Sequence, residues 1–144
     1  MFFGTYNHQL DQKGRMRIPA KLRKDLGTRV YVMRGSTKCL YIFTEEQFNN
    51  VENALSSLAL FNNEKQDMVR ALLSTSALIE EDGQGRFLLS SELRKLMNIE
   101  KDIVFIGAGK KIELWSKEEW DKAQGRIEEA FEQSLSIVTA DLGI

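Results

Sequence analysis

Short apolar runs, many of them rich in β-branched and aromatic residues, alternate with polar turns along the whole chain and predict many short strands. In the first half the predicted strands are residues 4–10, 16–18, 30–33 and 40–43. In the second half they are residues 77–79, 87–89, 103–106 and 112–115, with 107–109 as the turn between the last two. Strands mixed with helices in this way indicate the α+β class.

Helices are predicted where apolar positions recur every three or four residues. Thr44 with Gln47, and Ser116 with Glu119, form capping-box patterns that open two helices. The first of these carries an apolar face of Phe48, Val51, Leu55 and Leu58. The second is expected to bury the stripe Trp120, Ala123, Ile127, Phe131 and Leu135.

Three further helices complete the predicted elements. One begins at Pro19 and ends near Gly27, and another is capped by Ser91 and runs through Met97. The third lies near residues 63–73 and is expected to turn Met68 and Leu72 inward.

The segment from Asp11 to Pro19 occurs twice in the chain. Its repeat runs from Asp82 to Ser90, 71 residues later, and keeps the Asp, Gly and Arg at the same spacing. The sequence is therefore a tandem duplication of one small unit. We expect a first unit over residues 1–75, including a connector helix, and a second unit over 76–144 that ends in a helix.

The repeated Asp-x-x-Gly-Arg has the composition of a tight hairpin turn. Gly14 and Gly85 can take the positive φ that a tight reversal requires. Such a reversal places Asp11 opposite Arg15, so the carboxylate can hold the guanidinium in one orientation. A surface pair of this kind adds little stability, and its expected role is to aim the arginine outward. A solvated hairpin without function is the alternative.

Length and composition set limits on the fold. With 144 residues, each unit can bury only a thin core, so each is expected to need its twin or another subunit. The start of the chain has neither a charged segment nor an apolar segment typical of a signal peptide. Cys39 is the single cysteine, which agrees with a reducing cytoplasm.

Charge is distributed unevenly along the chain. The net charge is −1, but residues 11–29 hold seven basic and two acidic side chains, and residues 82–101 hold four basic and three acidic ones. All positive excess therefore lies around the two turns. This segregation is typical of a surface that binds phosphates, with acidic surfaces elsewhere.

Signatures of an enzyme are scarce. His8 is the only histidine and Cys39 the only cysteine, so neither a Cys/His metal cluster nor a Ser-His-Asp set is expected, and no cofactor is predicted. The glycines of residues 107–109 precede two lysines, but the spacing does not match a phosphate-binding P-loop. We predict no catalytic residue and no metal ligand.

The basic turns are the candidate functional site. Arg15 and Arg86, common to both units, are the candidates for reading guanine edges in the major groove. Lys13 and Arg17 are expected to contact phosphates, and Gln84 either reaches a base or fills its turn. The residues expected to orient the turns are Asp11, Gly14, Asp82 and Gly85, while Arg23, Lys24 and Arg94 are expected to lie further back.

With Tyr6-x-His8-x-Leu10-Asp11-x-Lys13-Gly14-Arg15, then Ile18-Pro19, and a second Asp82-x-x-Gly85-Arg86, the whole chain resembles the MraZ family of bacterial proteins. The resemblance implies two AbrB/SpoVT-like swapped-hairpin β-barrel units with flanking helices, assembling as a ring of the octamer or dodecamer class. It also implies a cytoplasmic, nucleoid-associated transcriptional regulator of the division and cell-wall gene cluster. Its partner is then double-stranded promoter DNA with short repeats, including its own promoter. Ser90 replaces the proline expected at this place in the second unit.

Two other functions remain as alternatives. An AbrB-like antitoxin usually has one hairpin unit and a disordered tail, whereas here the tail is predicted to be an amphipathic helix. A ring-forming scaffold could bind protein partners through its acidic helices. A mobility shift with the DNA upstream of the gene distinguishes the regulator from the scaffold.

Overall fold

The computed structural model describes the backbone of residues 1–144 and every side chain except that of Ala59. The strands are β1 (Phe2–Gln9), β2 (Arg15–Met16), β3 (Val30–Arg34), β4 (Cys39–Thr44), β5 (Ala77–Ile79), β6 (Phe87–Leu88), β7 (Asp102–Gly109) and β8 (Ile112–Ser116). The helices are α1 (Ala20–Arg23), α2 (Glu45–Ala59), α3 (Asn63–Ser74), α4 (Ser91–Leu96) and α5 (Lys117–Leu142). The α+β class predicted from the pattern is confirmed.

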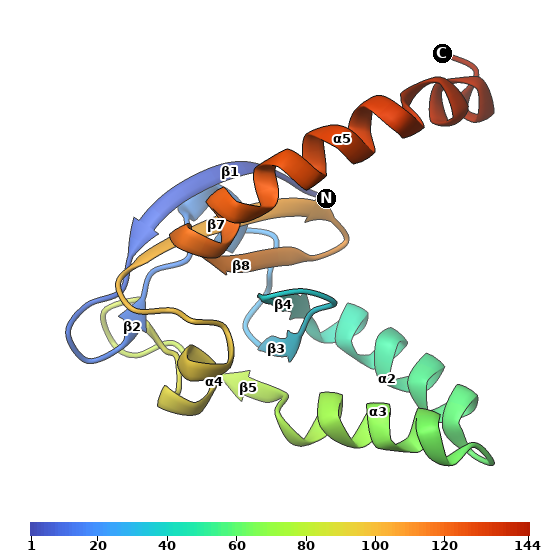
Figure 1. Cartoon of the computed structure of the whole chain (residues 1–144). Helices are drawn as coiled ribbons and strands as arrows, with labels where there is room; N and C mark the ends of the chain where they lie inside the picture. Colours follow the sequence, from blue (N-terminus) through green and yellow to red (C-terminus); the bar gives the residue numbers. More distant parts are fainter.

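The strands form one six-stranded antiparallel sheet in the order β1-β7-β8-β4-β3-β5, and a separate two-stranded sheet of β2 and β6 (Figure 1). The counterparts in the two units are β1 and β5, β3 and β7, and β4 and β8. Exchanging the members of each pair gives the same strand order, read from the opposite edge of the sheet. The sheet therefore has an internal pseudo-two-fold symmetry, whose axis passes between β4 and β8.

The two units share strands, so neither has a sheet of its own. The first strand of each unit pairs with the third strand of the other, β1 with β7 and β5 with β3. Where β1 crosses β7, a side chain on Gly107 would overlap the backbone of Phe3. This pairing agrees with the expectation that each small unit needs its twin or another subunit.

Two predictions about the strands are wrong. The sheet is not a closed barrel: β1 and β5 are its edges and do not pair with each other, because β5 is only three residues long and pairs with β3. Nor do the strands on either side of the first turn form a hairpin. β2 pairs with β6 of the second unit instead of β1. The residues of the turn thus contact one another, but the strand that follows the turn pairs with the other unit.

The main core lies between the six-stranded sheet and a layer made of α1, α4, β2 and β6. Leu40 and Leu114, opposite each other on β4 and β8, are fully buried at its centre. Leu22 of α1 and Leu93 of α4 pack into the same cluster. The two helices thereby hold the segments that follow the two turns against the sheet.

A smaller apolar cluster lies under the start of α5. It consists of Cys39, Trp115 and Ala123, with Trp120 and Ile127 packed against it. Beyond this point the prediction of a buried stripe is wrong, since Phe131 is 57% exposed and Leu135 is 45% exposed. The reason is visible in Figure 1, where α5 continues past the edge of the sheet and has nothing beneath it.

Helices α2 and α3 pack on each other and on β3 and β4, and parts of their apolar faces stay open. The capping predicted for Thr44 is present, with its Oγ1 accepting the N–H of Gln47. Met68, which was expected to turn inward, is 45% exposed, and Leu58 on the apolar face of α2 is 59% exposed. The helix pair extends beyond the strands, so part of its apolar surface has no neighbour within the chain.

Two local features differ from the prediction. Ser90, and not Ser91, caps α4, because its Oγ accepts the N–H of Leu93. Ser90 occupies the position that Pro19 has in the first unit, and its hydroxyl caps the helix where the first unit has a proline. Residues 107–109 lie within β7, and the chain reverses at Lys110 and Lys111.

Among the described residues, none of the helices combines the length and the apolar character needed to cross a membrane.

Candidate nucleic-acid interface

The first turn, residues 11–15, is held by a single carboxylate. Oδ1 of Asp11 accepts the backbone N–H groups of Lys13 and Arg15, each at 2.9 Å. Oδ2 accepts Nε of Arg15 at 2.6 Å. The backbone closes with Gly14 N–H donating to the carbonyl of Asp11 and with Gly14 at φ +80°. This conformation favours glycine, so the sequence prediction for the turn is confirmed.

The second turn, residues 82–86, repeats these contacts. Oδ1 of Asp82 accepts the N–H groups of Gln84 and Arg86, and Oδ2 accepts Nε of Arg86 at 2.8 Å. Gly85 has a φ of +77°. The backbone N–H of Arg86 is the largest cause that lowers the pKa of Asp82 to about 2, and the same interaction from Arg15 lowers the pKa of Asp11. Both carboxylates are therefore charged at neutral pH.

Both arginines keep donors for a ligand. A guanidinium has five N–H donors, and Nε uses one of them on the aspartate. Among the described side chains, the terminal nitrogens of Arg15 and Arg86 have no hydrogen-bond partner. The two side chains are 26% and 23% exposed. The aspartate thus fixes the plane of the guanidinium while the forked end stays available, which suits bidentate contact with a base or a phosphate.

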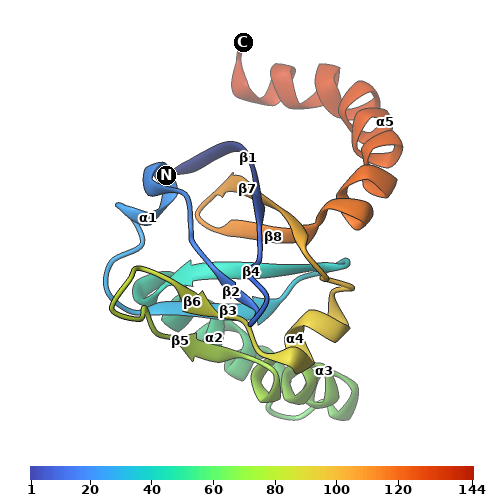
Figure 2. The same ribbon diagram turned by 90° about the vertical axis from the view of Figure 1, so that its left-hand side faces the viewer.

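The two turns lie side by side. β2 and β6 pair with Arg15 opposite Leu88, and the N–H of Leu89 donates to the carbonyl of Gly14 at 3.0 Å. Nη1 of Arg17 donates to the carbonyl of Gln84 in the second turn. Both loops lie at the left of Figure 1, and Figure 2 shows β2 beside β6 from that end. The pair of turns therefore forms one platform, which we call the paired turns (residues 11–15 and 82–86).

Two arginines behind the paired turns support them. The guanidinium of Arg94 lies directly beneath Gly14, where a Cβ would come within 2.7 Å of Cζ, and its Nε donates to the carbonyl of Leu89 at 3.1 Å. Arg23 forms an ion pair with Glu81 at 3.2 Å, next to the second turn. These contacts join each unit to the turn of the other, so the separation of the two turns is fixed.

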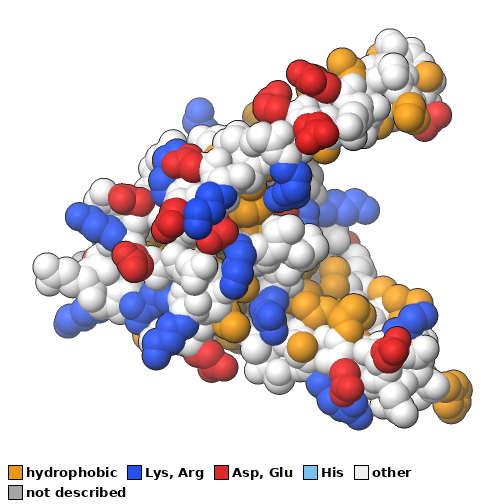
Figure 3. Space-filling model, in the orientation of Figure 1, with side chains coloured by type: hydrophobic (Ala, Val, Ile, Leu, Met, Phe, Trp, Pro, Cys, Tyr) orange, Lys and Arg blue, Asp and Glu red, His pale blue; other side chains and the backbone are white. Residues whose placement is uncertain are grey.

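The predicted site residues therefore meet on one surface. The paired turns bring together Lys13, Arg15, Arg17, Gln84 and Arg86, which are far apart in sequence. Lys13 and Gln84 are exposed at the tips. Figure 3 shows several Lys and Arg side chains at this end of the molecule, with Asp and Glu side chains between them. The predicted concentration of positive charge thus coincides with the turns.

Sequence reasoning missed the supporting roles of Arg94, Glu81 and Arg17. The sequence predicts Arg94 only as a residue behind the site and Arg17 only as a phosphate contact, although the guanidinium of Arg17 bridges the turns. The repeated Leu-Arg-Lys of residues 22–24 and 93–95 was a signal for structural arginines after each turn. Glu81 carries no such signal, because its partner lies 58 residues away.

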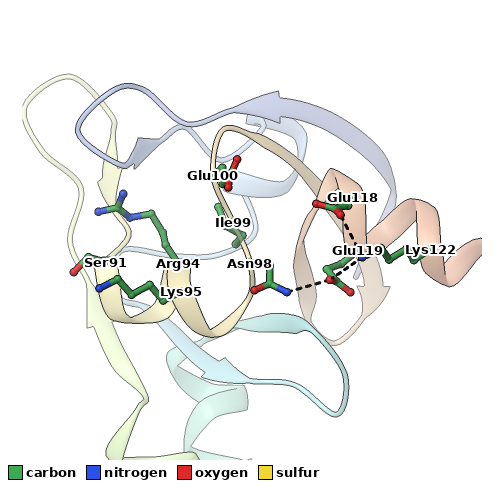
Figure 4. Close-up of a pocket in the computed structure, with 9 residues that line it drawn as sticks. All are labelled: Ser91, Arg94, Lys95, Asn98, Ile99, Glu100, Glu118, Glu119 and Lys122. Carbon is green, nitrogen blue, oxygen red and sulfur yellow. Dashed lines mark hydrogen bonds and ion pairs between the residues drawn. The ribbon is translucent and has the colours of Figure 1, made fainter.

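A shallow hollow of about 440 Å³ lies beside α4 and the start of α5 (Figure 4). Arg94 and Lys95 point to one side of it, and Asn98 donates to the carboxylate of Glu119 at 3.1 Å. Its acidic side is already occupied by Lys122, which pairs with Glu118 at 3.2 Å. The charges within the hollow compensate one another, so it does not select a ligand of either sign.

The single histidine and the single cysteine both pack against other residues of the fold. His8 lies on β1 with its ring edge against Phe105, 5.7 Å between centroids. Cys39 is buried, and burial raises the pKa of its thiol to about 11, which leaves it unreactive at neutral pH. Among the described side chains, no three of the His, Cys, Asp and Glu residues are grouped so that they could hold a metal ion.

The chain is similar to a family of known proteins over nearly its whole length. A family model described as "MraZ protein, putative antitoxin-like" matches residues 1–71 and again residues 72–138. A protein of Desulforamulus reducens named "Transcriptional regulator MraZ" is 38% identical over 92% of this chain and 94% of its own length. Proteins of the same name from Caldanaerobacter subterraneus subsp. tengcongensis and Clostridium botulinum (strain Alaska E43 / Type E3) are 37% and 42% identical. They cover 92% and 83% of this chain, and 93% and 84% of their own lengths.

Proposed function

Because the chain belongs to the MraZ family, we propose that it is a DNA-binding transcriptional regulator that contacts promoter DNA through the paired turns. Arg15 and Arg86 read base edges in the major groove, and Lys13 and Arg17 contact phosphates. Gln84 reaches a base from the second turn. The protein acts in the cytoplasm at the nucleoid, and its chemistry needs no cofactor.

One observation carries this proposal. Two aspartates hold two arginines in the same way, on turns that are fixed side by side, and both forked ends stay available. A structural ion pair would normally use the terminal nitrogens as well, since a bidentate pair is stronger. Keeping them unused on an exposed platform favours a role in binding an external acceptor.

The proposal extends to the target of the protein. We propose that the protein binds short repeats in its own promoter and regulates the division and cell-wall gene cluster. The exchange of strands between units corresponds, in this proposal, to the swapped hairpin of AbrB/SpoVT-type proteins contained within one chain. The DNA is recognised as a duplex, because two rigid turns fit the groove of a duplex better than they fit a flexible single strand.

Several copies of the chain act together on such a promoter. One platform offers few contacts, so its affinity for a single repeat is low, and copies joined in a ring of the octamer or dodecamer class gain affinity by avidity. The spacing of promoter repeats then matches the spacing of platforms. Binding falls steeply as salt rises, since each phosphate contact releases counterions.

Footprinting of the purified protein on the DNA upstream of its gene tests the proposal. Wild type should protect short repeated sites, while Arg15→Ala and Arg86→Ala should lose this protection but keep the same assembly state. Arg126→Ala is the matched control, because Arg126 is exposed on α5, far from the turns. Unchanged protection by both turn variants would refute the role of the paired turns.

A protein-interaction scaffold is the second candidate. It is favoured by the exposed apolar side chains on the second half of α5, including Phe131 and Leu142. If this candidate is correct, the wild-type protein does not distinguish its upstream DNA from random DNA.

A further inference from the structure

An apolar groove lies between the helix pair α2 and α3 and the strands β3 and β4. Its volume is about 540 Å³, and its apolar lining includes Tyr41, Phe43, Val51, Leu55, Met68 and Leu72. Arg34 and Lys111 lie at its rim. In Figure 3 hydrophobic side chains gather over this part of the molecule. Apolar hollows of this kind are uncommon on a free surface and mark sites where something binds.

A second apolar surface lies on the outer half of α5. Ile127, Phe131, Leu135, Val138 and Leu142 follow one another at intervals of four, four, three and four residues, so they form one narrow stripe. The last four are between 45% and 66% exposed. The stripe continues the face that packs on the sheet at Ala123 and Ile127. From Phe131 onward its described side chains stay exposed.

The stripe does not reach the groove within one chain. Helix α5 has 26 residues and is therefore about 39 Å long. Its first turns are fixed on the sheet by Trp120 and Ala123. Figures 1 and 2 both show its outer half pointing away from α2 and α3. Bringing the two surfaces together would require breaking the helix.

We propose that the outer half of α5 from one copy of this chain binds in the α2–α3 groove of a second copy. A narrow apolar helix face is the shape that fits a groove between two helices and a sheet. Each surface would cover the other, and both would leave water. The inference rests on the proposed homo-oligomer and adds the surfaces through which it is built.

Charge complementarity supports this occupant over an unrelated protein. Between residues 127 and 142 the helix has four acidic side chains and no basic one, namely Glu128, Glu129, Glu132 and Asp141. The groove offers Arg34 and Lys111. Among the described residues Arg34 has no ion pair, whereas Lys111 pairs with Glu113 at 3.4 Å. An acidic helix with an apolar stripe thus fits an apolar groove with a basic rim.

The contact is heterologous, because helix and groove are different surfaces. A copy that has bound one neighbour through its helix still has a free groove. Further copies therefore add in the same direction until the last copy binds the first and closes a ring. The paired turns are absent from both surfaces. Assembly by this contact leaves the DNA platform of every copy exposed.

Two variants separate the surfaces. Leu135→Asp places a charge on the stripe and Met68→Asp places one in the groove, and both residues are already 45% exposed, so folding should be preserved. Each variant alone should lose assembly, with association at least about tenfold weaker in sedimentation or light scattering. Ile137→Asp, off the stripe, and Leu58→Asp, outside the groove, are the matched controls and should assemble like wild type.

Mixing the two variants gives the decisive result. One intact helix and one intact groove remain in the mixture, so a heterodimer with a single contact should form and grow no further. Assembly by both single variants overturns the inference, and so does loss by Leu135→Asp alone, which would indicate helix-to-helix pairing. Failure of two folded variants to form the heterodimer overturns it as well.

The same experiment separates this inference from the proposed function. A wild-type protein that is monomeric at all concentrations overturns both the assembly and the contact. A wild-type protein that assembles and binds its promoter, with variants that also assemble, overturns the contact alone. Assembly without selective DNA binding leaves the contact intact and overturns the regulator.

Discussion

Replacing Arg15 by lysine separates base reading from charge. Asp11 fixes the plane of the guanidinium through Nε at 2.6 Å, so the two terminal nitrogens remain available for a ligand. Lysine keeps the charge but has one ammonium group and no fork. A bidentate contact between arginine and guanine contributes about 1–3 kcal/mol of discrimination. The expected loss in the ratio of specific to non-specific affinity is therefore about 5- to 150-fold.

Fluorescence anisotropy with a promoter duplex and a scrambled duplex, at several salt concentrations, measures this ratio. Arg15→Lys should weaken promoter binding, leave scrambled binding unchanged and keep the salt dependence. Lys13→Gln is the matched comparison, because it removes a proposed phosphate contact. It should weaken both duplexes equally and reduce the salt slope by about 0.9. If Arg15→Lys retains the full ratio, Arg15 does not read a base in the way argued above.

Three further predictions concern the framework of the site. Gly107→Ala should lower the free energy of unfolding by about 1–3 kcal/mol in denaturant titration, because the new Cβ meets the backbone of Phe3; Gly83→Ala, with open space around it, should change it little. The pKa of Asp82 is lowered from 3.8 to about 2 in the folded protein. The stabilising effect of the charged carboxylate should therefore be complete above pH 4 and be lost as the pH falls through 2. Asp82→Asn should flatten the pH dependence of the free energy of unfolding in that window. Arg94→Ala should speed hydrogen exchange at the Leu89 amide, which donates to Gly14, whereas exposed Lys95→Ala should not.

The local features of the site could be predicted from the sequence because their causes are local. The turn depends on a carboxylate and a glycine within five residues, and both copies formed as expected, with φ of +80° at Gly14 and +77° at Gly85. The caps at Thr44 and Ser116 have the same short range. In each case the residues that make the contacts are neighbours in sequence, so composition and spacing are sufficient.

The exchange of strands could not be predicted in this way. β1 pairs with β7 and β2 pairs with β6, so both partners lie in the other unit, far away in sequence. The apolar pattern of a strand does not name a partner at such a distance. Gly107 is the residue that admits β1, yet in the sequence it suggested a turn. Periodicity also predicted burial along α5 as far as Leu135, although a pattern of apolar positions does not state whether the covering surface belongs to the same chain.

Duplication within one chain has a consequence that a dimer of single units would lack. In a symmetric dimer the two turns would be identical, whereas here their tips have diverged: the first carries Lys13 and the second carries Gln84 at the same position of the turn. The arginines and aspartates that hold the turns have stayed the same. On the proposed interface, one end of the platform therefore binds phosphate more strongly than the other. A platform with two unlike ends distinguishes the two directions of a DNA repeat, and copies joined head to tail would all face the same way along the promoter. Unlike tips and a head-to-tail contact are thus mutually consistent, since the tips give each platform a direction and the contact would repeat that direction from copy to copy.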